Sequence, residues 1–260
     1  MWFDLNMFTR LGLLNFRRIA RAQLLILWLS ATNAAHASAP EKGWILKQKT
    51  GMMGEHTLYV SSKGIRVDSK ETDYVILLKP PAWRVILFNR KTKTVYEVDA
   101  DLWQGRLAFG VAGLASAGRF DGLSRRDAGV CQDSGVKARR ILMMSTHPTV
   151  VIRSDGTKQL DGQLVRSCEY FVAADMPIPA KAAHVVQRFY KIPLADGIPL
   201  HLTFVNEYGG RKPELETREC RTEVLPASIF ANPEGYQRVK RDSDVALDSA
   251  NQGLLEEMAK

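Results

Sequence analysis

The sequence predicts an α+β fold in which an antiparallel sheet makes up most of the chain and helices pack against it. Three observations support this prediction. After residue 40 the chain is mostly a series of short runs of β character separated by short turns, which is typical of antiparallel meanders. Two segments, 102–118 and 180–190, have helical character instead. The composition, 45% hydrophobic and 25% charged over 260 residues, is that of a globular protein with a full core.

The first 39 residues have the pattern of a secretory signal peptide. Arg17, Arg18 and Arg21 precede a short apolar stretch, and an A-x-A sequence that ends at Ala39 follows it. The apolar stretch is shorter than the roughly 20 residues that span a bilayer. We therefore expect cleavage near Ala39 and a periplasmic or secreted protein. An uncleaved N-terminal membrane anchor is the alternative.

Cleavage there would leave a folded domain over residues 40–240 and a polar C-terminal tail over 241–260. The removed segment carries four Arg and one Asp, so the net charge would fall from +8 to +5. A modest positive charge of this kind favours solubility and an anionic membrane surface as a partner. Nucleic acid is not expected as a partner, because the chain is exported and has no basic-aromatic cluster.

The strands are predicted from apolar and β-branched runs that end at turn residues. Their order along the chain is 43–49, 57–60, 65–68, 74–78, 83–88, 94–98, 141–144, 149–153, 164–173, 198–206 and 214–225. The first hairpin turns at Ser61-Ser62-Lys63-Gly64, and Pro80-Pro81 ends the strand 74–78 because proline cannot donate to a sheet ladder. Residues 119–137 are polar and contain glycine, and they predict a loop around Cys131.

The two helical segments differ in the stability that we expect of them. Residues 180–190 follow two prolines and precede Pro193, which favours a short, well-bounded helix. Residues 102–118 contain four glycines, each of which lowers helix propensity by about 1 kcal/mol. The segment 102–118 is therefore either a core helix packed on the sheet or a mobile lid over an apolar cavity.

No catalytic, cofactor or metal motif is present in the sequence. It has no G-x-S-x-G, no H-E-x-x-H and no Gly-rich phosphate loop, and its histidines do not follow a ligand spacing. Asp99 and Asp101 form a carboxylate pair just after a strand, where such residues are usually solvated. We expect no enzyme activity, no cofactor and no metal site.

The three cysteines, Cys131, Cys168 and Cys220, predict one disulfide and one free thiol in an exported protein. A zinc site is disfavoured because there is no C-x-x-C and no nearby His pair. In the expected strand order Cys168 and Cys220 lie on strands separated by one other strand, roughly 9–10 Å apart, which is too far for a bridge. A disulfide from Cys131 to one of them is then expected.

The order of several short motifs resembles the periplasmic lipoprotein-carrier superfamily, which includes the Lol carrier, its outer-membrane receptor and related secreted proteins. The motifs are Gly64-Ile65-Arg66-Val67-Asp68, Lys93-Thr94-Val95-Tyr96-Glu97-Val98 and the closing Pro233-Glu234-Gly235-Tyr236. The resemblance spans about residues 43 to 240. The Cys-bearing segment 119–137 and the tail are departures from the smaller carrier.

The resemblance implies a strongly curved antiparallel sheet, an incomplete β-barrel, with helices that cover its concave face and an apolar cavity that holds acyl chains. It also makes Arg66 a candidate polar gate, because the strand of Arg66 resembles the arginine-bearing strand of the family. The residues agree with this fold. The strands 74–78 and 83–88 are apolar at nearly every position, so both faces must be covered or one must line a cavity. The helices 102–118 and 180–190 are the expected covers.

The candidate ligand contacts are inward positions of the strands and of the segment 102–118. They are Leu58, Ile76, Leu78, Val85, Leu87, Trp103, Leu107, Val111 and Leu114. The leading hypothesis is an exported carrier or sensor of a lipid, acyl chain or lipoprotein, which could also contact the envelope membrane surface or another envelope protein. The alternatives are an envelope interaction domain whose core is filled without a ligand, and a hydrolase with an unrecognised site.

Overall fold

The structure is a computed structural model of the 260-residue chain. It describes residues 41–51, 53–70, 73–105, 119–146, 150–152, 158–160 and 165–246. The chain divides into two compact units, Met1–Ala39 and Pro40–Lys260, and every element below belongs to the second unit.

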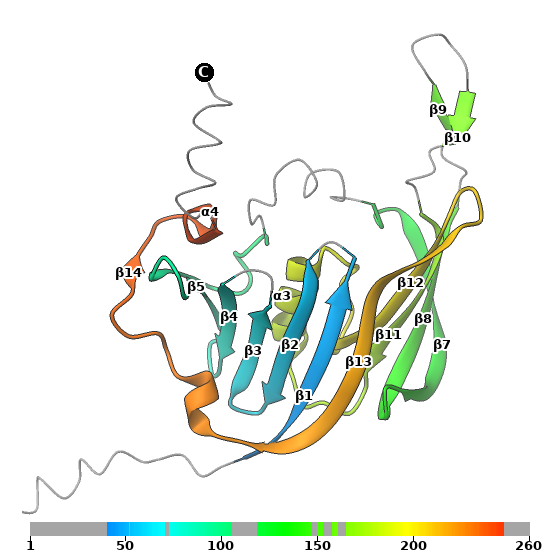
Figure 1. Cartoon of the computed structure of the whole chain (residues 1–260). Helices are drawn as coiled ribbons and strands as arrows, with labels where there is room; N and C mark the ends of the chain where they lie inside the picture. The colour runs from blue at the N-terminus through cyan, green and yellow to red at the C-terminus, as the bar shows by residue number, and fades with distance from the viewer. Residues whose placement is uncertain are drawn as a thin grey trace, which may run out of the picture. The chain divides into compact units, whose positions relative to one another are not determined.

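A meander of six antiparallel strands forms the first half of a twelve-stranded sheet (Figure 1), and each strand pairs with the next one along the chain. The strands are β1 (Glu41–Thr50), β2 (Gly54–Ser61), β3 (Gly64–Ser69), β4 (Tyr74–Lys79), β5 (Arg84–Asn89) and β6 (Thr94–Val98). All six strands that the sequence predicts up to residue 98 are therefore confirmed. A turn at Ser62 and Lys63 joins β2 to β3.

The second half of the sheet continues from the free side of β1. The strands there are, in spatial order, β13 (Arg211–Leu225), β12 (Pro199–Asn206), β11 (Val165–Ala173), β8 (Val136–Ser145) and β7 (Leu123–Asp133). At the opposite edge β14 (Gln237–Arg238) pairs in parallel with β6. The edges are thus β14 and β7, so the sheet is open and not closed into a barrel. A separate pair, β9 (Val150–Ile152) and β10 (Lys158–Leu160), lies outside it.

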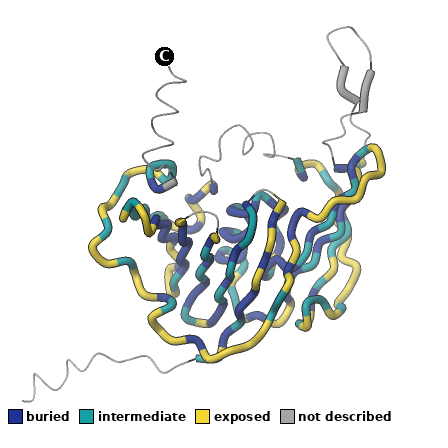
Figure 2. The backbone as a smooth tube through the Cα atoms, in the orientation of Figure 1, coloured by how far each residue is buried: buried dark blue, intermediate teal, exposed yellow. Residues whose placement is uncertain are grey.

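The predicted loop over residues 119–137 is wrong, because most of this segment is the edge strand β7 and its hairpin to β8. β7 is exposed along most of its length (Figure 2), so its sequence shows no apolar alternation that could reveal a strand. A register shift between Asp127 and Val130 interrupts the pairing, and Gly129 has a φ of +90° there. The glycine that suggested a loop instead belongs to a β-bulge.

The predicted helix 180–190 is confirmed as α3 (Ala180–Tyr190). It ends at Lys191, which adopts a left-handed conformation and closes the last turn through its backbone N–H. Of the predicted segment 102–118, residues 102–105 lack helical structure and residues 106–118 lie outside the described residues. None of the helices in the described part of the chain is long and apolar enough to cross a membrane.

Side chains alternate between two apolar clusters on the two faces of the meander. Leu58, Ile65 and Val67 lie in the larger cluster together with the buried residues of α3, and we call this side the α3 face. Val75 and Leu77 lie in a smaller cluster on the other side, the opposite face. The apolar runs in β4 and β5 are explained by this arrangement, since consecutive residues of a strand point to opposite faces and both faces are buried here.

The opposite face is covered by part of the C-terminal segment 225–246, and not by the helices 102–118 and 180–190 that the sequence predicts as the covers of the sheet. The first part of the C-terminal segment, with η1 (Ala227–Phe230), covers this side, whereas Val239 and Val245 of the later part, which includes β14 and α4 (Asp242–Ala246), belong to the larger cluster. Leu225 and Phe230 are buried in the smaller cluster, and Ile229 and Tyr236 pack against it. Val245 of α4 is fully buried, so residues 241–246 belong to the folded domain and not to a polar tail.

The expected disulfide is absent, because Cys131, Cys168 and Cys220 are all free thiols in the structure. β8 lies between the strands of Cys131 and Cys168. Cys131 is opposite Ala138 of β8, whereas Cys168 is opposite Met143, which places them roughly 17 Å apart along the strands. A disulfide needs Cα atoms within about 7 Å, so this pair cannot bridge.

Candidate functional site

The structure brings the described candidate ligand contacts together on the α3 face. Leu58, Ile76, Leu78, Val85, Leu87 and Trp103 are each at most 2% exposed and belong to one continuous apolar cluster. Cross-strand pairing explains this, since Ile76 is directly opposite both Val67 and Leu87, and Leu78 is opposite Val85. Leu107, Val111 and Leu114 lie outside the described residues.

A buried polar network fastens α3 to the sheet within this cluster. The hydroxyl of Tyr190 donates to Gln48 Oε1 at 2.9 Å, and Gln48 Nε2 donates to the carbonyl of Pro199 at 2.7 Å and to Thr217 Oγ1 at 2.9 Å. Thr217 in turn donates to the carbonyl of Leu200 at 2.6 Å. One glutamine of β1 thereby connects α3, β12 and β13. No local sequence pattern marks this network, because its members are far apart in the chain.

His56 lies beside this network and is a buried titratable group of the α3 face. It is 1% exposed and is directly opposite Gln48, and its ring lies 5.5 Å from that of Phe189 and 5.3 Å from that of Tyr190. Its Nδ1 lies 3.1 Å from the carbonyl of Gly54, while its buried Nε2 has no partner. Burial lowers the pKa of His56 to about 4, so the ring is neutral at pH 7. A carbonyl can only accept, so Nδ1 carries the proton.

The chain just before residue 106 is held from two sides. Arg188 Nη1 donates to the carbonyl of Ala100 at 2.9 Å and to that of Trp103 at 3.3 Å, and Lys191 Nζ donates to the carbonyl of Gly105. On the other side the indole of Trp103 donates to Asp242 of α4 at 3.2 Å. Residues 100–105 are thus fixed between α3 and α4.

The chain just after residue 118 contains a buried ion pair between Arg119 and Glu214 of β13. The side chain of Glu214 is 6% exposed and that of Arg119 is 18% exposed. The guanidinium lies 4.8 Å from the ring centre of Phe120 and 4.6 Å from that of Phe204. Burial raises the pKa of Glu214, although Arg119 acts in the other direction. No sequence motif marks a pair that is separated by 95 positions.

Arg66, the candidate polar gate, lies on the opposite face. Its Nε donates to Asp68 at 2.7 Å, its Nη1 donates to the carbonyl of Ile229 at 2.9 Å, and its guanidinium lies 6.0 Å from the ring centre of Phe88. Arg90 also binds Asp68, at 2.7 Å. These contacts attach η1 to the sheet, so we assign Arg66 to the cover of the opposite face.

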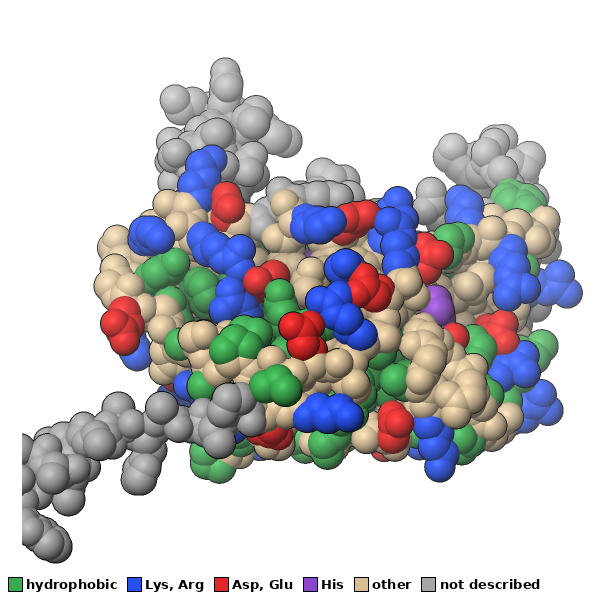
Figure 3. All heavy atoms as spheres, turned by 60° about the horizontal axis from the view of Figure 1, so that its bottom comes forward, with side chains coloured by type: hydrophobic (Ala, Val, Ile, Leu, Met, Phe, Trp, Pro, Cys, Tyr) green, Lys and Arg blue, Asp and Glu red, His purple; other side chains and the backbone are tan. Residues whose placement is uncertain are grey.

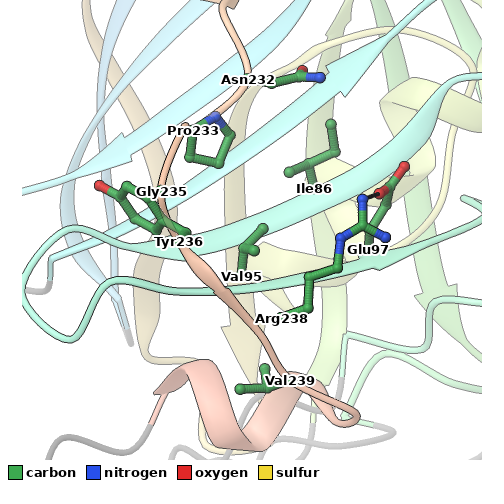
Figure 4. A pocket seen from close by; sticks show the side chains of 9 residues that line it. All are labelled: Ile86, Val95, Glu97, Asn232, Pro233, Gly235, Tyr236, Arg238 and Val239. Atoms are coloured by element: carbon green, nitrogen blue, oxygen red, sulfur yellow. Dashed lines mark hydrogen bonds and ion pairs between the residues drawn. The ribbon is translucent and has the colours of Figure 1, made fainter.

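A pocket of about 200 Å³ lies on the opposite face between β5, β6 and the C-terminal segment (Figure 4). Its lining includes Ile86, Val95 and Tyr236, with Glu97 and Arg238 as charged groups. Arg238 bonds to Glu97 at 3.2 Å, and Arg84, outside the lining, lies 3.1 Å from the same carboxylate. The carboxylate is therefore neutralised from two sides.

The outer surface carries charges of both signs. Lys and Arg are interspersed with Asp and Glu on the face that Figure 3 shows. On β13, Arg221 pairs with both Glu219 and Glu223, and Lys47 of β1 pairs with Glu219 at 2.6 Å. Exposed pairs of this kind contribute little to stability, because solvent and salt screen them.

One Asp–His pair bears on the hydrolase alternative. His201 Nδ1 lies 2.7 Å from Asp133, and the two side chains are 29% and 16% exposed. Ser134 donates to the same aspartate at 3.0 Å. A catalytic triad instead places the hydroxyl on the imidazole, so that the ring can take its proton. Among the described residues, no group of three or more His, Cys, Asp or Glu is placed to hold a metal ion.

Comparison with known proteins identifies similar structures but no sequence family: no family model matches the sequence, and no curated protein matches it. An uncharacterised conserved protein from Thermus thermophilus is similar over 76% of this chain and 90% of its own, with 13% identity and a TM-score of 0.39. The Pseudomonas aeruginosa MucA/MucB complex is similar over 78% of this chain and 59% of that chain, with 15% identity and a TM-score of 0.33. A LolA superfamily protein from Nitrosomonas europaea is similar over 75% of this chain and 91% of its own, with 8% identity and a TM-score of 0.23.

Proposed function

We propose that the mature protein binds a hydrophobic ligand, namely a lipid, an acyl chain or a lipoprotein, at the α3 face, as a carrier or sensor without enzyme activity. The observation that carries this proposal is the continuous apolar surface across β1 to β5 on that face. The opposite face has its own cover in the C-terminal segment. On the α3 face the described cover is α3 together with Trp103, Phe120 and Val245 from neighbouring segments.

The proposal places the protein in the envelope. The signal-peptide pattern supports export, with cleavage near Ala39. N-terminal sequencing of exported material should begin near Pro40. Recovery of Met1 from a membrane fraction would favour the N-terminal anchor instead.

A second candidate function is an envelope interaction domain without a ligand. The complete burial of Leu58, Leu78 and Val85 favours it, because side chains that already fill a core leave no room for a tail. Under the leading proposal a ligand must therefore displace packed side chains of the α3 face.

Native mass spectrometry of the protein purified from the exported fraction tests the leading proposal. A co-purified lipid, identified after organic extraction, is the expected result. Protein without any lipid that also fails to bind a fluorescent fatty-acid probe would overturn the proposal and leave the interaction domain.

Two neighbouring leucines of β4 locate the site. Leu78 lies on the α3 face and Leu77 on the opposite face, and both are fully buried. Leu78→Ala and Leu77→Ala should each destabilise the fold by about 2–5 kcal/mol. Only Leu78→Ala should change the affinity for the fatty-acid probe. Equal changes in the two variants would place the ligand elsewhere.

A further inference from the structure

The ion pair between Arg119 and Glu214 is unusual in this protein because it is poorly satisfied. Burying two charges costs several kcal/mol per ion unless the pair and its remaining hydrogen-bonding groups are fully matched. Here the Nε of Arg119 is buried and has no hydrogen-bond partner among the described residues. Other pairs in the described chain, such as Lys47–Glu219 and Arg218–Glu216, are exposed to solvent.

The position of the pair links it to the α3 face. Phe120 and Phe204, whose rings flank the guanidinium of Arg119, both belong to the apolar cluster that contains Leu58 and Leu78. Gly51 at the end of β1 lies against the carboxylate of Glu214, since a Cβ built on it would be 3.4 Å from Oε2. A cation thus lies at the border of the apolar surface, against two aromatic rings that pack edge to face.

We propose that Arg119 binds the anionic head of the ligand whose tail lies on the α3 face, so that the ligand is an acyl chain with a carboxylate or phosphate head. This inference rests on the proposed function. A guanidinium binds carboxylates and phosphates through two parallel N–H groups, and the free Nε of Arg119 supplies one of them. In the absence of ligand, the carboxylate of Glu214 pairs with the guanidinium of Arg119. The ligand head displaces Glu214, whose ionised form is disfavoured by burial.

Matched amphiphiles test this inference. Palmitate, palmitoyl lysophosphatidate and methyl palmitate share the same tail, and the first two carry a carboxylate and a phosphate head. The wild type should bind at least one anionic amphiphile about tenfold or more tightly than the ester, as expected for a hydrogen bond to a charged group. The anion that binds more tightly identifies the head group.

Variants assign the preference to Arg119. Arg119→Gln should abolish the preference for the anion, so that the anions and methyl palmitate bind alike, whereas Arg119→Lys should keep part of the preference. Arg66→Gln is the matched control, because Arg66 is as buried as Arg119, at 17% and 18% exposure, but lies on the opposite face. It should leave the preference intact.

Glu214→Gln provides an independent readout if Arg119→Gln does not fold. It removes the carboxylate that competes for the guanidinium, so affinity for the anion should rise several-fold. An unchanged or weaker affinity for the anion in Glu214→Gln would overturn the inference. If the wild type bound palmitate, lysophosphatidate and the ester equally, the inference would also be overturned, but the proposed function would stand. If the wild type bound none of the three, the proposed function itself would be overturned.

Discussion

His56 should make the protein lose stability as the pH falls from about 6.5 to about 4. The unfolded chain binds a proton on this side chain near its ordinary pKa of 6.5, whereas burial lowers the pKa in the folded protein to about 4. The folded state therefore resists protonation in that interval, and the free energy of unfolding decreases as the pH drops. Above pH 6.5 both states are neutral and the contribution is constant.

The size of the effect follows from the two pKa values. A difference of one unit corresponds to 1.36 kcal/mol, so the full loss is about 3 kcal/mol and about 2–3 kcal/mol of it is reached at pH 4.5. The side chain is 1% exposed, so solvent does not screen the effect. A loss of this size is a large fraction of the stability of a typical domain. The contacts of His56 with Phe189 and Tyr190 make α3 the element that should loosen first.

Urea unfolding at pH 7 and pH 4.5 measures this contribution in the wild type and in His56→Asn. Asparagine can still donate to the carbonyl of Gly54 but does not titrate. The wild type should lose about 2–3 kcal/mol more than His56→Asn between the two pH values. His184→Asn, at a partly exposed histidine of α3, is the control and should behave as the wild type. Equal losses in the wild type and in His56→Asn would refute the assignment of the low pKa to His56.

The remaining predictions concern the thiols and two glycines. Thiol titration of the denatured, unreduced protein should give three free thiols, and a count of one would show that a disulfide is present. In the native protein Cys131 and Cys220 should react before Cys168, because Cys168 is buried and its pKa is raised to about 12. Gly197→Ala should lower the free energy of unfolding by more than about 2 kcal/mol, because a Cβ would lie 2.3 Å from the carbonyl oxygen of Ala173. A Cβ at Gly129 would meet open space, so Gly129→Ala should lower the free energy of unfolding only by the roughly 1–2 kcal/mol that its left-handed backbone costs. If urea unfolding gave comparable losses of stability for the two variants, the close approach at Gly197 would not be the cause.

The sequence by itself determined the elements whose signals are local. The strands β1 to β6 appear as short apolar runs between turns, and the boundaries of β6 and α3 were predicted to the residue because turn residues and prolines border them. The predicted inward positions Leu58, Ile76 and Leu78 also lie on one face. Strand period and chain breaks act over a few residues, so no tertiary information was needed.

The tertiary structure alone decided how distant segments meet. β7 is polar on both sides because it is an exposed edge, so its sequence resembles a loop. The C-terminal segment covers the opposite face through apolar residues without a regular period, and its Ile229 carbonyl accepts a hydrogen bond from Arg66. Arg119 and Glu214 meet across 95 positions of sequence, and Gln48 joins three elements through its amide. The burial of these residues, the low pKa of His56 and the position of Arg119 at the edge of the apolar surface depend on how the sheet brings distant residues together. Desolvation depends on all neighbours in space and not only on those along the chain.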